Sequence, residues 1–188
     1  AGKKLAIVDK SSGITRDRHE VKGKLGDLDI TFIDTAGFED QNDDSLASRI
    51  RDQTNRAVKK ADVALFLIDA RSGLTSLDEH FAHWLRRQDV PIILVANKCE
   101  SRASEIGLYE SLRLGFGEPV AISAEHGNGM GNLYSSLEPF SAEYAQNNLY
   151  DLECGAENPK NIEDDLENSS LQMAIVGRPN VGKSTLVN

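Results

Sequence analysis

Residues 177–184 read GRPNVGKS, which fits the pattern G-x-x-x-x-G-K-[ST] of a phosphate-binding loop. The apolar run MAIV precedes it at residues 173–176, and TLV follows at residues 185–187. This order predicts a strand, a glycine-rich loop and the start of a helix, the context that gives the pattern its meaning. Backbone N–H groups of such a loop point into one concavity and bind phosphate oxygens. We expect Lys183 to reach the outer phosphates and the Ser184 hydroxyl to ligate magnesium.

The position of this loop leaves two interpretations open, because it lies at the end of the 188-residue chain. Such a loop normally opens a nucleotide-binding domain. Either residues 172–188 begin a second domain, or they supply a starting strand that the upstream domain lacks.

The chain is long enough for one good hydrophobic core with a segment left over. Its net charge of −9 is uneven, because residues 151–170 hold seven acidic residues and one lysine, a net of −6 that leaves −3 for the rest. This composition predicts a solvated, mobile linker. We therefore divide the chain into a domain at residues 1–147, an acidic linker at 148–171 and a strand with its phosphate loop at 172–188. The acidic balance argues against direct nucleic-acid binding.

Other classes of site have no support in the sequence. No apolar run approaches the ~20 residues of a membrane span, and the N-terminus lacks the apolar core of a signal peptide. Cys99 and Cys154 form no C-x-x-C pair, so we expect two reduced thiols and a cytoplasmic location. The histidines lack metal-ligand spacing and are interpreted as surface residues: His19, His80, His83 and His126.

Upstream of the linker the pattern alternates between strands and helices. Apolar runs occur at residues 30–33, 63–68, 92–95 and 120–122, and helical spacing at 45–60, 77–87 and 105–114. A hairpin is predicted from residues 21–25 and 28–33 around Gly26-Asp27. This alternation predicts a doubly wound α/β sheet, which binds ligands at the carboxyl ends of its strands.

Three short motifs follow predicted strands at that edge. Asp34-Thr35-Ala36-Gly37 offers a carboxylate for a magnesium-bound water and a glycine N–H for a terminal phosphate. In Asn97-Lys98-Cys99-Glu100, the amide can bond a base edge and the lysine stem can cover the ring. The Glu100 carboxylate can accept the two N–H groups that guanine has and adenine lacks. Ser123-Ala124-Glu125 has backbone N–H groups that could meet the guanine carbonyl.

This ordered set resembles the TrmE-Era-EngA-like, translation-factor-related GTPases, and most closely the bacterial double-GTPase family EngA, also called Der. The resemblance covers nearly the whole chain. Residues 2–9 resemble the segment after the first phosphate loop, 13–18 switch I and 34–38 the start of switch II, while 172–188 resemble the opening of the second GTPase repeat. It implies a P-loop GTPase fold whose mostly parallel sheet has one antiparallel edge strand.

The resemblance also implies roles for individual residues. Thr15 would ligate magnesium with Ser184, Asp34 would hold its water shell, and Gly37 would contact the γ-phosphate. Asn180 stands where potassium-dependent relatives hold a monovalent cation, and Phe38 stands where Ras-like proteins have the water-placing glutamine. Hydrolysis is therefore expected to be slow and potassium-stimulated. Glu100 replaces the usual aspartate, so guanine affinity is expected to be modest.

The resulting site assignment combines these residues. The expected cofactors are GTP or GDP and Mg2+, with K+ as a candidate. The catalytic set is Lys183, Thr15, Gly37 and Asn180; the metal set is Ser184, Thr15 and Asp34; the nucleotide-binding set is Gly177, Asn180, Val181, Gly182, Lys183, Ser184, Thr185, Asp34, Asn97, Lys98, Glu100, Ser123, Ala124 and Glu125.

The favoured interpretation of the displaced loop is closure in a circularly permuted order. In the implied fold the strand before the phosphate loop is central, and an open slot there leaves backbone groups unpaired on both sides. Closing a linker of about 25 residues costs on the order of 3 kcal/mol. Burying four or five apolar side chains returns roughly 1.5–3 kcal/mol each. The donor is either the same chain or a neighbour in a strand-swapped dimer.

Two functions remain open at this point. The first is a guanine-nucleotide-binding, slowly GTP-hydrolysing protein with a role in assembly of the large ribosomal subunit, which the resemblance implies. The alternative is a truncated, nucleotide-incompetent interaction fragment of the same GTPase. Guanine-nucleotide binding that depends on Lys183 would separate the two.

Overall fold

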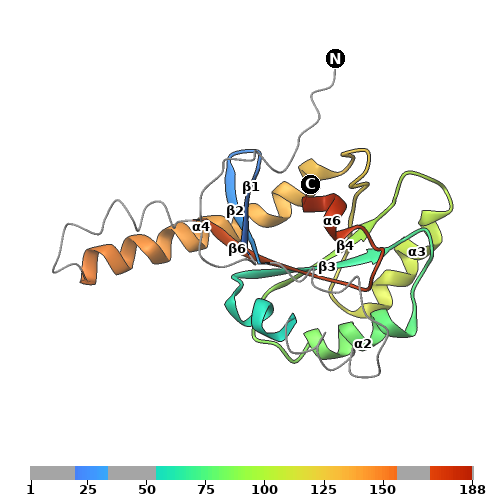
Figure 1. Cartoon of the computed structure of the whole chain (residues 1–188), viewed down its shortest axis with the longest axis horizontal. Coiled ribbons are helices and arrows are strands. Elements are labelled where there is room, and N and C mark those ends of the chain that lie inside the picture. The colour runs from blue at the N-terminus through green and yellow to red at the C-terminus, as the bar shows by residue number, and fades with distance from the viewer. Residues whose placement is uncertain (1–19, 34–53, 156–169, 188) are drawn as a thin grey trace, which may run out of the picture.

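The computed structural model describes residues 20–33, 54–155 and 170–187, and its centre is a six-stranded β-sheet (Figure 1). The strands lie in the order β1-β2-β6-β3-β4-β5; β1 and β2 pair antiparallel, and the other strand pairs of the described residues are parallel. The elements are β1 (Glu20–Leu25), β2 (Leu28–Ile33), β3 (Val63–Asp69), α2 (Ser76–Leu85), β4 (Ile92–Asn97), α3 (Ser104–Ser111), the short 3-10 helix η1 (Leu112–Leu114), β5 (Val120–Ala121), α4 (Met130–Gly155), β6 (Leu171–Val176) and α6 (Lys183–Val187). The arrangement confirms the predicted doubly wound α/β fold with one antiparallel edge strand.

Strand β6 occupies the middle of the sheet, between β2 and β3 (Figure 1). It runs parallel to both, with Met173 opposite Phe32 on one side and Val63 on the other. Before β3, the Asp62 N–H donates to the Gln172 carbonyl at 2.8 Å, and the Gln172 N–H donates to Oδ2 of Asp62 at 2.8 Å. The strand therefore has backbone partners on both sides. This confirms the predicted permuted order, here within one chain; the swapped dimer stays a prediction.

Each face of the sheet carries its own hydrophobic core, because successive strand residues point to opposite faces. In β3, for example, Leu65 belongs to the first core and Phe66 to the second. Helix α4 covers the first core through Leu133 and Leu137, while α2 covers the second through Leu85 (Figure 1). All residues of β3 are buried, which explains why its sequence is apolar almost without interruption.

The predicted linker and helix ends are only partly described. Residues 54–60 of the helix predicted at 45–60 are helical, and the rest lie outside the described residues. Helix α4 runs to Gly155, past residue 147, where the acidic linker is predicted to begin. Residues 156–169 lie outside the described residues, so the domain boundaries stay predictions.

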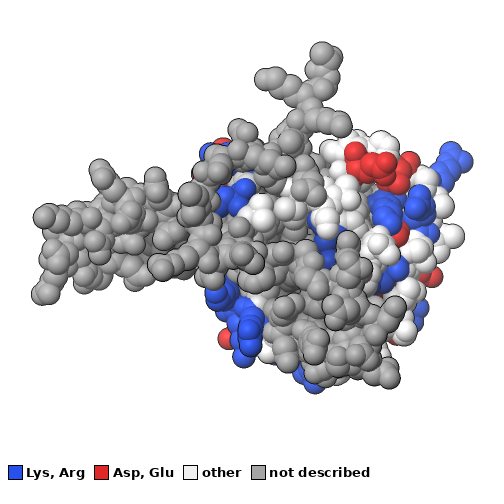
Figure 2. Space-filling view, in the orientation of Figure 1, with Lys and Arg blue, Asp and Glu red and all other residues white. Residues whose placement is uncertain are grey.

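The described surface carries charges of both signs. Figure 2 shows Lys and Arg side chains at several places on one face and a group of Asp and Glu side chains at its upper right. Among the described helices, none combines the length and the apolar character that crossing a bilayer would require.

Candidate functional site

The phosphate loop, residues 177–182, joins the end of β6 to the start of α6 and packs against the ends of β3 and β4. A Cβ atom at Gly177 would collide with the carbonyl oxygen of Leu67, and one at Gly182 would collide with Nδ2 of Asn97. Gly182 also has a φ of 101°, a conformation that favours glycine. Both glycines of the motif are therefore required because neighbouring atoms leave no room for a side chain, and Gly182 is required for its backbone conformation as well.

Lys183 folds back over this loop. Its Nζ donates hydrogen bonds to the carbonyls of Gly177 and Arg178, each at 3.0 Å. The ammonium charge is thereby held against the loop, where the motif predicts that it meets phosphate. Ser184 and Thr185 follow on the first turn of α6 and are exposed.

Asn97, at the end of β4, joins three parts of the site through one buried side chain. Its Nδ2 donates to the Val181 carbonyl of the phosphate loop at 2.7 Å. Its Oδ1 accepts the N–H of Ala124, beyond β5, at 2.9 Å. The side chain is 3% exposed. The sequence predicted Asn97 as a base contact, whereas the structure adds the role of a clamp between two loops.

Lys98 makes a second link from β4 to the phosphate loop. Its Nζ donates to the Asn180 carbonyl at 2.8 Å and to Oδ2 of Asp69 at 2.7 Å. Lys98 and Asn180 both have positive φ, 66° and 63°. Such strain in residues other than glycine persists where surrounding contacts fix the backbone, as these hydrogen bonds do.

Asp69 ends β3 and anchors Lys98. Its Oδ1 also accepts the N–H groups of Arg71 and Ser72 at 3.0 and 3.1 Å, and the residue is 7% exposed. Burial acts to raise the pKa of Asp69, but the hydrogen bond and charge of Lys98, together with those N–H groups, lower it overall from the usual 3.8. The carboxylate is therefore held in its ionised form.

The β4 loop (residues 97–100) and the β5 loop (residues 123–128) lie side by side at this edge of the sheet. The Cys99 N–H donates to the Ile122 carbonyl at 2.9 Å, and the Ser123 N–H donates to the Asn128 carbonyl at 3.0 Å. Backbone N–H groups of Ser123, Ala124 and Glu125 were predicted to contact the base. The N–H of Ser123 is bonded to Asn128 and that of Ala124 to Asn97, so Glu125 is the remaining candidate. Glu125 is exposed.

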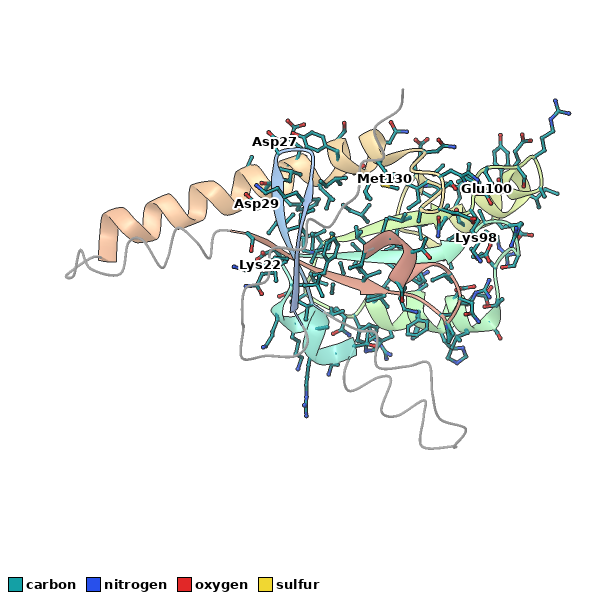
Figure 3. The ribbon with its side chains drawn as sticks, turned by 45° about the horizontal axis from the view of Figure 1, so that its top comes forward. Lys22, Asp27, Asp29, Lys98, Glu100 and Met130 are labelled. Carbon is teal, nitrogen blue, oxygen red and sulfur yellow. The ribbon has the colours of Figure 1, made fainter. Side chains whose placement is uncertain are left out.

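Figure 3 labels Lys98 and Glu100, which lie close together at the end of the molecule away from the hairpin residue Asp27. Glu100 is exposed, so its carboxylate is accessible to a ligand. The structure thus brings the phosphate loop and the two predicted guanine motifs to one edge. Thr15, Asp34 and Gly37 lie outside the described residues, and so does Phe38.

Of the predicted magnesium ligands, Ser184 is the one that the structure describes, and its exposed hydroxyl fits a ligand role. Within residues 20–33, 54–155 and 170–187, no cluster of three or more His, Cys, Asp or Glu side chains could hold a metal ion. The remaining predicted ligands fall in the segments outside these ranges.

Sequence reasoning missed two anchoring carboxylates. Asp69 had a usable signal, because it is a polar residue at the end of an apolar strand, like Asp34 and Asn97. Asp78, in the first turn of α2, fits a helix-capping pattern with Thr75, but that pattern does not indicate its contact with the phosphate loop. Its Oδ2 lies 3.2 Å from Nε of Arg178.

Comparisons with known proteins agree with this geometry. A family model described as "50S ribosome-binding GTPase" matches residues 1–98 and 172–188. The chain is 48% identical over 187 residues to "GTPase Der" of Rhodopseudomonas palustris strain TIE-1 and 50% identical over 187 residues to that of Novosphingobium aromaticivorans. Each match covers 100% of this chain and 40% of the relative. A third, from Hyphomonas neptunium, is 44% identical over 224 residues and covers 44% of that relative.

The chain spans 40–44% of the length of these curated relatives. The family match includes both the upstream strands and the phosphate loop that the sheet brings together. The chain therefore belongs to the 50S ribosome-binding GTPase family and, within it, to the EngA/Der GTPases that its motifs resemble.

Proposed function

We propose that this chain binds guanine nucleotides and hydrolyses GTP slowly. The observation that carries the proposal is the Asn97 clamp, which bonds the phosphate loop at 2.7 Å and the β5 loop at 2.9 Å from one buried side chain. Pieces far apart in the sequence thereby form one continuous edge, with a phosphate-binding end and a base-binding end. This supports nucleotide binding over the alternative in which the half-sites never meet.

The base-binding end favours guanine. Guanine presents two adjacent N–H donors that a carboxylate can accept together, and adenine offers no such pair. Glu100 is an exposed carboxylate beside Lys98, whose stem can cover the face of a base. Since Glu100 is one methylene longer than the aspartate expected in this family, modest affinity is part of the proposal.

The phosphate-binding end suits phosphoryl transfer to water. That reaction needs little covalent chemistry from the protein, so positioning and charge stabilisation account for most of the catalysis. Lys183 and the N–H groups of the loop would hold the phosphate chain, with Gly37 at the γ-phosphate. Ser184, Thr15 and Asp34 would hold Mg2+, which neutralises phosphate charge when bound. Asn180 would favour K+, and Phe38 cannot orient a water, so the proposed rate is slow and potassium-stimulated.

The proposed cellular role is in assembly of the large ribosomal subunit, with nucleotide state controlling docking. Its support is family membership, since the matching family is described as binding the 50S ribosome.

Calorimetry with GDP in potassium buffer tests the binding proposal. Lys183→Ala is expected to weaken GDP binding at least about tenfold, because it removes the charge facing the phosphates. Lys60→Ala, on the exposed face of the helical segment 54–60, is the control and should bind like the parent chain.

Two outcomes would contradict the proposal. If neither the parent chain nor Lys183→Ala binds GDP, the chain is the interaction fragment instead. If both bind equally, the ligand does not use the phosphate loop.

A further inference from the structure

An ion pair with a fully buried carboxylate connects the phosphate loop to the first turn of α2. Nε of Arg178 lies 3.2 Å from Oδ2 of Asp78, and the two side chains are 18% and 0% exposed. Nη2 of Arg178 also donates to Oγ of Ser72, in the connection between β3 and α2. The Arg178 side chain therefore contacts both α2 and the connection that precedes it.

The carboxylate of Asp78 is itself fixed in place. Its Oδ2 accepts the N–H of Thr75 at 3.0 Å and the Thr75 hydroxyl at 2.7 Å, while the N–H of Asp78 donates to that hydroxyl at 3.4 Å. This is a capping box at the N-terminus of α2. Because the cap holds the carboxylate in place, the position of Asp78 determines where the Arg178 side chain lies. The position of Arg178 in turn constrains the backbone of the phosphate loop.

We propose that Arg178 and Asp78 are positioning residues for the phosphate loop, and that their ion pair sets the affinity for the phosphate chain of a nucleotide without contacting the base. The inference rests on the proposed nucleotide binding. Loss of Arg178 leaves the Asp78 carboxylate fully buried without its counter-ion, and loss of the Asp78 charge leaves the half-buried guanidinium without one, so the loop has to rearrange.

Binding of a ligand to the β4 and β5 loops alone provides a measurement that separates this proposal from a general structural role of the ion pair. The N–H of Cys99 in the β4 loop donates to the carbonyl of Ile122, just before the β5 loop, and the N–H of Ser123 donates to the carbonyl of Asn128 within the β5 loop. Arg178 has no part in either bond. A ligand that lacks phosphates should therefore be insensitive to the ion pair. A merely structural role of the pair would weaken every ligand alike.

The test compares GDP with guanosine as ligands of the whole chain carrying Asp78→Asn. Asparagine keeps an acceptor for Thr75 but removes the charge that Arg178 faces. We expect the affinity for GDP to fall roughly tenfold and the affinity for guanosine to change less than about twofold. Glu79→Gln is the matched control, because it removes one exposed negative charge from the same turn of α2. It should leave both affinities unchanged.

Arg178→Met tests the pair from its other side and covers the case in which Asp78→Asn fails to fold. The same GDP-specific loss is expected, and the double variant should lose no more than either single variant. Equal losses for GDP and guanosine, or no loss for GDP, would overturn the inference while leaving the proposed function intact. Failure of the parent chain to bind GDP would overturn both.

Discussion

The phosphate loop and the β4 and β5 loops meet at one edge of the sheet but are held there by different kinds of contact. Carbonyls of the phosphate loop accept hydrogen bonds from side chains that lie far away in the sequence, those of Asn97 and Lys98. The β4 and β5 loops share the Asn97 side chain through the N–H of Ala124, and they are also joined by a backbone hydrogen bond from Cys99 to Ile122. The contacts of the phosphate loop with these strand ends come from particular side chains, whereas the β4 and β5 loops have a backbone bond as well.

This difference implies that the two halves of the site tolerate substitution to different extents. Backbone hydrogen bonds survive most substitutions, because every residue except proline supplies the same donor and acceptor. Bonds from a single side chain are lost with that side chain. We therefore expect substitutions to disturb the phosphate loop before they disturb the β4 and β5 loops.

The largest effect is expected from Met173→Ala in β6, the strand that carries the phosphate loop. Met173 is 1% exposed and belongs to the first core, so truncation should lower the free energy of unfolding by about 2–5 kcal/mol. Urea unfolding followed by circular dichroism measures this loss. Hydrogen exchange should show phosphate-loop amides losing protection before those of β4.

The control for Met173→Ala lies on the edge strand β1. Val21 is 39% exposed, and Val21→Ala should change the free energy of unfolding by less than about 0.5 kcal/mol. Equal losses of unfolding free energy in the two variants would mean that β6 contributes no more to the stability of the sheet than the edge strand β1 does. That result would contradict the prediction that the phosphate loop depends on the packing of β6.

An intermediate effect is expected from Asn97→Ala, which removes the clamp itself. The carbonyl of Val181 and the N–H of Ala124 lose their partner, at a cost of about 1–3 kcal/mol in the free energy of unfolding. Asn132→Ala, on an exposed position of α4, is the control and should be nearly neutral. A loss no larger than that of the control would show that the two loops do not depend on each other.

Much of the fold could be predicted because its signals are local. Apolar runs predicted the central strands, and Gly26-Asp27 between alternating segments predicted the hairpin, whose turn has Gly26 at a φ of 67°. Helix α4 had no counterpart among the predicted helices. Gly131 and Pro139 weaken its helical signal, but burial of Leu133 and Leu137 against the sheet outweighs their propensity.

The candidate site was predictable as chemistry but not as a set of contacts. The glycine-rich loop and the motifs at the strand ends can be recognised from their residue types and their order along the chain. The clamp by Asn97 and the pairing of Arg178 with Asp78 depend on how three connections pack together, which no local pattern encodes.

The smallest effect is expected from Asp69→Asn, and it depends on pH. Because the pKa of Asp69 is lowered in the folded protein from 3.8, its charge contributes stability at neutral pH that is lost as the pH falls through and below that value. The parent chain should therefore exceed Asp69→Asn by about 1 kcal/mol at pH 7, and the difference should shrink below about pH 4. Urea unfolding at the two pH values measures it.

An exposed ion pair supplies the matched control for this charge. Lys24 and Asp29 lie 2.9 Å apart with side chains 62% and 57% exposed, whereas the side chain of Asp69 is 9% exposed. Solvent screens the exposed pair, so Asp29→Asn should have no measurable effect at either pH. If the loss from Asp69→Asn persists unchanged in acid, the geometry of the acceptor matters and its charge does not. Lys98 would then be held to the phosphate loop as an ordinary hydrogen-bond donor, and the phosphate loop would depend on side-chain shape more than on charge.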